Sequence, residues 1–239
     1  MRVGTAFKPG RQYWEPLMIK TASLYKSSIG HKVLVAVAGI FLCAFLIVHL
    51  SGNLLLFKND GGAAFDQYSG AMAKNPVIRA MEIVLGMGFL IHIIFAVQTW
   101  IGNRLARPVR YTMNRPGENS ELSSRIMFVT GSATFIFLVV HLRSFLVPTR
   151  FAAGVEPSMY QLVRGAFASP VYDAFYLIAL VLLGYHLRHG FQSAFQTLGI
   201  TPKRIRLIDA VAVFFWLVIP AGFATMPLCF LWLHLKGVN

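Results

Sequence analysis

Long apolar runs separated by short polar linkers dominate the pattern along the chain. Such runs cover residues 32–57, 77–102, 126–147, 171–195 and 207–235. A helix of roughly 20 apolar residues is long enough to cross a hydrocarbon core of about 30 Å. Every linker between the runs contains proline and most contain glycine, which commonly mark turns and loops. The pattern therefore predicts an all-α membrane protein, with five transmembrane helices in a bundle after an N-terminal arm at 1–31.

Composition supports this interpretation. The chain is 56% hydrophobic and only 13% charged, whereas a soluble domain is about 45–50% apolar and about 25% charged. We expect the first run to be a true span and not a cleavable signal peptide, because it exceeds the usual apolar core of about 7–15 residues. Both cysteines, Cys43 and Cys229, lie inside apolar runs. We expect them to act as small hydrophobic side chains without a disulfide.

The distribution of Lys and Arg predicts the orientation. The net charge is +13, and lipid-embedded chains collect such charges in their cytoplasmic loops. Fourteen Lys and Arg side chains lie in the N-terminal segment through Lys32 and in the second and fourth linkers, against seven on the other side. We therefore expect the N-terminus inside and the C-terminus outside the cytoplasmic (inner) membrane. Topology explains the basic charge, so we expect no nucleic-acid partner. The short segment MYQLV (159–163) in the third linker predicts a helix at the membrane interface.

Four of the apolar runs contain a histidine, and their depths match in pairs. At a rise of about 1.5 Å per residue, His49 and His141 lie about 23–25 Å from the cytoplasmic end of their spans. His92 and His186 each lie fifteen residues after the start of the second and fourth runs, which cross in the opposite direction. The second pair is therefore expected deeper toward the cytoplasm, and each pair joins two different helices.

An ionisable side chain inside a membrane indicates a functional site. Two imidazoles that face each other across a bundle are what an iron porphyrin needs for axial ligation, because neutral imidazole binds iron well. The porphyrin edge needs space, and Gly52, Gly88 and Gly190 lie close to these histidines in sequence, where a missing side chain would supply it. The alternative is that each histidine forms a hydrogen bond between helices or lines a pore.

Three other histidines are weaker candidates. His189 lies one turn after His186 and competes with it as a ligand, although the depth of His186 is the better match. His31 and His234 lie at the inner and outer boundaries of their spans. Neither has a partner at the same depth, so an ordinary interfacial histidine is the simpler interpretation of both.

Three segments of this sequence resemble a known family. They are SSIGHKVLVAVAGIFLCAFLIVHLSGNLLLF (27–57), the expected loop FDQYSG (65–70) and HLRHGFQSAFQTLG (186–199). Together they resemble the cytochrome b membrane anchor of succinate dehydrogenase and fumarate reductase, the succinate:quinone oxidoreductases. The similarity is to the type with one chain, five helices and two haems, and it extends from about Ser27 to the C-terminus.

The resemblance implies two b-type haems and two partner chains, a flavoprotein subunit and an iron–sulfur subunit on the cytoplasmic side. It implies that His92 and His186 ligate the inner haem, nearer the iron–sulfur subunit, and that His49 and His141 ligate the outer one. Electrons would pass between the iron–sulfur subunit and a membrane quinone, with menaquinone favoured over ubiquinone. The resemblance also allows a higher oligomer of the complex.

Further polar side chains gain candidate roles from this resemblance, although each can equally be an ordinary interfacial group. The candidates for contacts to haem propionates are Lys32, Arg125, Arg143, Arg188 and His189. Candidates for a quinone site are Ser28 and His31 on the inner side and Glu82, a carboxylate inside the second span. Glu82 also has Arg79 one turn away, so an ion pair within the helix is the alternative.

The sequence lacks motifs for succinate chemistry. It contains no glycine-rich dinucleotide motif, and its two cysteines are too few for an iron–sulfur cluster. An electron-transfer subunit is therefore favoured over a complete enzyme. Rival hypotheses are the cytochrome b subunit of a formate dehydrogenase or nitrate reductase, a proton-coupled transporter, and an anchor without haem.

Overall fold

A computed structural model describes residues 27–106, 126–151, 158–200 and 206–237, and these residues form helices without any strand. The helices are α1 (Ser28–Asn53), η2 (Leu54–Phe57), α2 (Ala63–Lys74), α3 (Pro76–Leu105), α6 (Met127–His141), η3 (Leu142–Leu146), α7 (Val147–Phe151), α8 (Met159–Ala166), α9 (Pro170–Thr197), α10 (Arg206–Val213), η5 (Phe214–Val218) and α11 (Ile219–Leu235).

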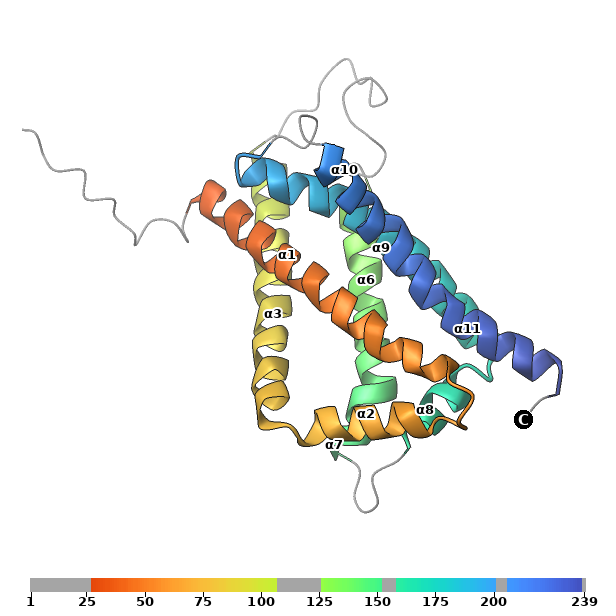
Figure 1. The fold of residues 1–239 in the computed structure, drawn as a ribbon. Coiled ribbons are helices and arrows are strands. Elements are labelled where there is room, and N and C mark those ends of the chain that lie inside the picture. Colours follow the sequence, from red (N-terminus) through yellow and green to blue (C-terminus); the bar gives the residue numbers. More distant parts are fainter. Residues whose placement is uncertain (1–26, 107–125, 152–157, 201–205, 238–239) are drawn as a thin grey trace, which may run out of the picture.

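Five of these segments are long and apolar enough to cross a membrane, which confirms the expected number of spans. They are Ser28–Phe57, Pro76–Leu105, Met127–Phe151, Pro170–Thr197 and Leu207–Leu235. The start of α1, the end of α3 and α10 lie at one end of the bundle, whereas α2, α7 and α8 lie at the other (Figure 1). Arg104 lies over the Trp100 ring at the first end and Lys236 over the Trp232 ring at the second, as is typical of membrane interfaces.

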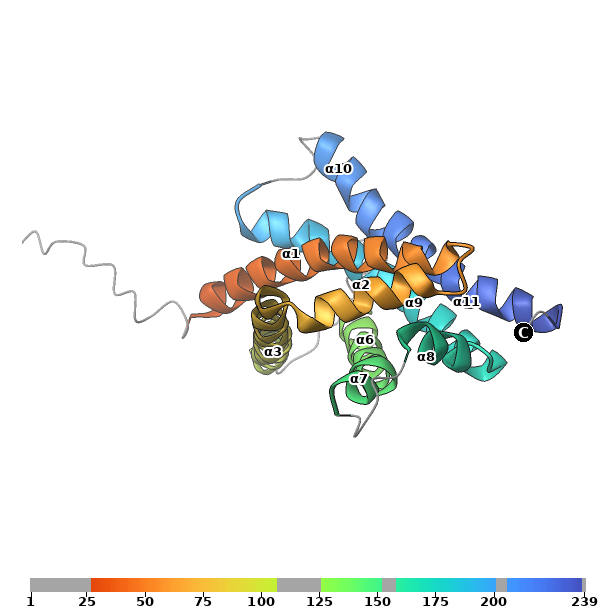
Figure 2. The same cartoon turned by 60° about the horizontal axis from the view of Figure 1, so that its bottom comes forward.

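Helix α9 lies at the centre of the bundle and packs against α1, α6 and α11. Its residues Leu180, Leu183 and Phe191 belong to one buried cluster with Cys43 of α1 and Ile219 of α11. Helix α3 packs mainly on α1 and has no buried residue. Figure 2 shows α3 at the edge of the bundle, with α1 beside it. Most of the α3 surface is therefore free to contact lipid or another molecule.

Two spans contain a π-helical turn that the apolar pattern did not predict. The turn η3 precedes Pro148 and the turn η5 precedes Pro220. A proline ring clashes with the carbonyl four residues earlier, and in both spans that carbonyl lies inside the π turn, at Ser144 and at Trp216. Widening the turn relieves the clash. Gly184 of α9 packs against the Trp216 carbonyl, which would lie 2.8 Å from an added Cβ atom.

The first and third linkers form helices that bind each other at one end of the bundle. The expected loop FDQYSG is wrong, because these residues lie within α2, whose cap Gly62 has a φ of 91°. The expected helix at MYQLV is confirmed as the start of α8. The Asp66 carboxylate of α2 accepts hydrogen bonds from Ser158 Oγ at 2.6 Å and Tyr160 N at 2.8 Å. This polar contact fixes α2 against α8.

Candidate functional site

His92 of α3 and His186 of α9 face each other between the helices, with ring centroids 6.2 Å apart and planes at 76°. The Nδ1 atom of His92 lies 3.1 Å from the backbone carbonyl oxygen of Val35 in α1. A carbonyl can only accept, so the proton of the neutral imidazole lies on Nδ1. The Nε2 atom of His92 is therefore unprotonated and available as a ligand.

Glycine on the neighbouring helix lets each of these two rings approach the backbone. A Cβ atom at Gly39 would lie 3.2 Å from His92 Cε1, and one at Gly131 would lie 3.4 Å from His186 Cε1. A helical side chain covers the turn that precedes it, so a side chain at position 39 would cover the Val35 carbonyl. Gly39 precedes His49 by ten residues and Gly131 precedes His141 by ten residues. This repeated spacing is the sequence signal that could have identified both glycines.

His49 of α1 and His141 of α6 form the second pair, with ring centroids 5.7 Å apart and planes at 88°. Aromatic rings surround the pair: Phe45 and Phe223 contact His49, and Phe137 and Phe145 contact His141. His141 Nδ1 lies 3.0 Å from the hydroxyl of Tyr176 on α9. The structure thus brings together the same two pairs that the depths predict.

The geometry of both pairs fits a metal ion bound between them. Two imidazoles that bind one metal from opposite sides, with bonds of about 2 Å, have ring centres about 6 Å apart. Within the described parts of the chain, no group of three or more His, Cys, Asp or Glu side chains could hold a metal ion. Two histidines on opposite sides of a metal would supply two of its ligands, and a planar ligand such as a porphyrin would supply the remaining positions. Within the described residues, the buried Nδ1 atom of His186 has no hydrogen-bond partner.

Three glycines that we expected beside a porphyrin accommodate side chains of other helices. An added Cβ atom at Gly52 would lie 2.6 Å from the Tyr68 ring, and one at Gly88 would lie 3.1 Å from Phe41. At Gly190 the neighbour would be the Met127 side chain at 3.6 Å. These contacts show which side chains lie beside the three glycines, and the expectation that they leave space for a porphyrin edge stays a prediction.

The other predicted contact residues are distributed over α1, η3 and α9, or lie outside the described residues. The Arg188 guanidinium lies over the Trp216 ring at 5.4 Å, and the His31 ring packs on Phe95 with centroids 5.0 Å apart. Lys32, Ser28 and Arg143 are exposed, and His189 is half-buried on α9. Arg125 lies outside the described residues. The roles of these side chains stay predictions.

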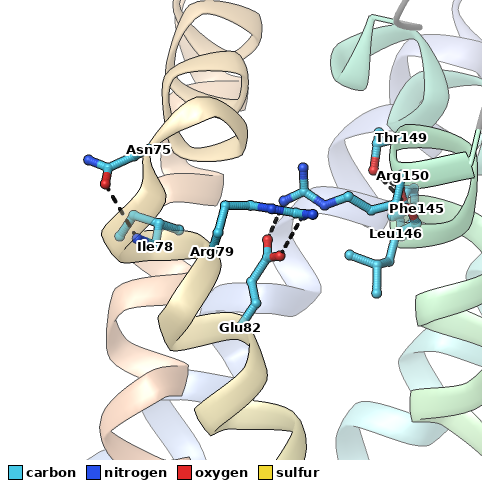
Figure 3. A network of polar contacts seen from close by, with 8 residues as sticks. All are labelled: Asn75, Ile78, Arg79, Glu82, Phe145, Leu146, Thr149 and Arg150. Atoms are coloured by element: carbon cyan, nitrogen blue, oxygen red, sulfur yellow. Dashed lines mark hydrogen bonds and ion pairs between the residues drawn. The ribbon is translucent and has the colours of Figure 1, made fainter.

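Glu82 forms ion pairs with two arginines, one of which the sequence did not suggest (Figure 3). Arg79 Nη1 lies 2.9 Å from Glu82 Oε2 within α3, and Arg150 of α7 binds the other carboxylate oxygen. At the opposite end of α3, Trp100 stacks on Phe128 of α6 with centroids 4.1 Å apart. Helix α3 is thus connected to the third span near both of its ends.

Asp173 is a buried carboxylate at the start of the fourth span. It lies in the first turn of α9, yet it is only 1% exposed. Neither of its carboxylate oxygens has a hydrogen-bond partner. Its position at the start of an apolar run gave no signal of burial, because the packing of α8, α9 and α11 into one buried cluster, with Val163, Tyr176 and Phe230, is a tertiary contact.

Comparisons with family models, curated proteins and solved structures found no match to this chain. The geometry of the two histidine pairs therefore carries the functional argument, together with the resemblance of the sequence motifs.

Proposed function

We propose that this chain is the dihaem cytochrome b anchor of a succinate:quinone oxidoreductase. The single observation that carries the proposal is the arrangement of four histidines from four spans as two facing pairs, at 6.2 Å and 5.7 Å. Histidines that only formed hydrogen bonds between helices would not be expected to face one another in pairs, with similar ring distances, at two depths. The motifs at 27–57, 65–70 and 186–199 favour the succinate family among dihaem cytochromes.

In this proposal the protein holds and orients the redox groups. Haem b, when bound, supplies reversible one-electron transfer between ferric and ferrous iron. His92 and His186 would hold the inner group and His49 and His141 the outer group. The Val35 carbonyl and the Tyr176 hydroxyl would orient two of the four rings through Nδ1, as outer hydrogen-bond partners of ligating histidines do. The aromatic rings around the outer pair would exclude water.

The partners in this proposal are a flavoprotein subunit and an iron–sulfur subunit at the cytoplasmic end of the bundle. A quinone, menaquinone in preference to ubiquinone, would exchange electrons with the haems. The ion-paired Glu82 near one end and Ser28 with His31 near the other are its candidate contacts. Wherever it binds, this chain would perform no succinate chemistry of its own.

Haem content tests the proposal directly. The purified chain, alone or with its partners, should show the reduced-minus-oxidised spectrum of b-type haem, with about two haems per chain by pyridine haemochrome assay. His92→Ala and His141→Ala should each remove one haem, whereas His234→Ala, on an exposed side chain, should remove none. A folded but colourless protein would refute the proposal.

A proton-coupled transporter is the second candidate, and Asp173 is the observation that favours it. A buried carboxylate without a hydrogen-bond partner is typical of intramembrane proton relays. The colour of the protein separates the two candidates. If the chain binds haem but co-purifies with subunits other than a flavoprotein and an iron–sulfur protein, a formate dehydrogenase or nitrate reductase type of cytochrome b is the better assignment.

A further inference from the structure

We propose that Tyr176 is a positioning residue that fixes the tautomer of His141 and lowers the reduction potential of the haem held by His49 and His141. This inference rests on the proposed function. It concerns a residue on α9, a helix that carries a histidine of the other pair, so the role of Tyr176 was not visible from the depth pattern.

A chain of polar contacts connects the third and fourth spans. His141 Nδ1 lies 3.0 Å from the Tyr176 hydroxyl, which lies 3.2 Å from the Tyr172 hydroxyl. The Tyr172 hydroxyl donates to Ser144 Oγ at 2.8 Å. Ser144 belongs to the π turn η3, which starts one residue after His141. The contacts therefore form a ring that leaves the third span at His141 and returns to it at Ser144.

The direction of these hydrogen bonds follows from the chemistry of ligation. A ligating Nε2 atom carries no proton, so the proton of the neutral ring lies on Nδ1 and the Tyr176 oxygen accepts it. The single Tyr172 proton cannot serve both the Ser144 and the Tyr176 oxygens. If it goes to Ser144, the Tyr172 oxygen accepts from the Tyr176 hydroxyl, and every proton in the chain has an acceptor. Each tyrosine hydroxyl then accepts one hydrogen bond and donates another, and hydrogen bonds that run in one direction strengthen one another.

The residue is well suited to this role because it is held rigidly. Tyr176 is buried, and its ring packs edge-on against Phe137 and Phe167 with centroids 4.9 Å and 5.0 Å away. A rigid acceptor on Nδ1 makes the imidazole a stronger electron donor. A stronger donor stabilises ferric iron relative to ferrous iron and lowers the reduction potential.

The inner pair has no equivalent side chain. There, Val35 supplies a backbone carbonyl to His92, and His186 Nδ1 has no partner. The carbonyl of Met127, which precedes Gly131 by one turn, accepts instead from Thr130 Oγ1 at 3.1 Å. Of the hydrogen bonds that the described residues form with His92 and His141, the one to His141 comes from a side chain, so a substitution can remove it without altering the backbone.

The test is a redox titration of the full chain with Tyr176→Phe. The expected result is a retained content of two haems, a higher midpoint potential for one of them, and an altered low-spin ferric EPR signal for the same haem. Tyr172→Phe, which removes only the second contact, should shift the same haem in the same direction by less. Tyr185→Phe, on an outward-facing part of α9 where the side chain is 38% exposed, is the matched control and should shift neither haem.

The outcomes separate this inference from the proposed function. If Tyr176→Phe retains two haems at unchanged potentials and with unchanged EPR signals, the inference is wrong while the proposed function stands. If the unmodified chain binds no haem, the proposed function itself fails. If Tyr176→Phe does not accumulate, Tyr172→Phe and Ser144→Ala decide the question, because unaltered potentials in both variants would overturn the role of the polar chain.

Discussion

His92 Nδ1 reaches the carbonyl oxygen of Val35, 3.1 Å away on the neighbouring helix, because residue 39 has no side chain. An added Cβ atom there would lie 3.2 Å from His92 Cε1. The ring, the carbonyl and the glycine come from two helices, α1 and α3, and act as one unit. This unit fixes both the orientation and the tautomer of His92. A substitution at Gly39 should therefore alter haem binding at the inner histidine pair, although both histidines are retained.

The first prediction is that Gly39→Val displaces the His92 ring. We expect haem binding at the inner site to weaken by about 10–100-fold, as when an outer-shell partner of a metal ligand is lost. Gly86→Val on α3 is the matched control, because nothing lies within 4 Å of its Cβ position. Haem stoichiometry in the purified variants is the measurement. Equal haem content in both variants would contradict the role of Gly39.

The spans and the pairing of the histidines could be predicted because both depend on position along a helix. Burial in lipid requires long apolar runs, and a constant rise per residue converts position into depth. The contacts made around the histidines could not be predicted in this way. The contacts of Val35, Gly39 and Tyr176 depend on which face each helix turns toward its neighbour. The rise per residue gives the depth of a residue but not this rotation.

Local structure was missed where tertiary contacts determine it. The FDQYSG segment forms a helix because Asp66 is held by Ser158 and by the backbone of Tyr160, in a linker more than ninety residues away. The π turns could have been suspected from Pro148 and Pro220, but apolar patterning alone does not distinguish a π turn from an α-helical one. Arg150, the partner of Glu82 on α7, could not be predicted for the same reason: it is far from Glu82 in the sequence.

The second prediction concerns the cap of α2. Gly61 and Gly62 both have positive φ values, 66° and 91°, so alanine at either position should cost about 1–2 kcal/mol. At Gly62 the added Cβ atom would also lie 2.1 Å from the Tyr160 ring, whereas nothing is within 4 Å at Gly61. Overpacking should add about 1–3 kcal/mol at Gly62 alone. Thermal unfolding in detergent should therefore rank Gly62→Ala well below Gly61→Ala, and equal melting temperatures would argue against the contact between α2 and α8.

The third prediction is that Glu82 connects α3 to the third span. Glu82→Gln leaves the charge of Arg150 unpaired, and the Arg150 side chain is only 18% exposed. We expect a loss of about 1–3 kcal/mol in the free energy of unfolding, the range for a hydrogen bond to a charged group. Arg79→Gln removes the pair within α3, where the arginine is 50% exposed, and should cost less than about 1 kcal/mol.

Unfolding of both variants in the same lipid nanodiscs measures this difference. If Arg79→Gln is the more destabilising of the two, the Arg79–Glu82 ion pair within α3 contributes more to stability than the Arg150–Glu82 ion pair with α7. Haem content should stay at two per chain in both variants, because neither side chain contacts a histidine of the two pairs. A haem lost from Glu82→Gln alone would show that haem binding depends on the position of α3, which carries His92.

The last prediction is the orientation of the bundle. Lys58 follows the end of the first span, and Arg104 lies at the end of the second span, on the opposite side of the bundle; both side chains are exposed. The excess of Lys and Arg predicts that the Arg104 side faces the cytoplasm. In a chain with Cys43→Ala and Cys229→Ala, a cysteine in place of Lys58 should react with a membrane-impermeant maleimide in intact cells or spheroplasts. A cysteine in place of Arg104 should react only after the membrane is permeabilised. The reverse pattern would place the basic side outside, and the iron–sulfur partner could then not dock at the end where the inner histidine pair lies.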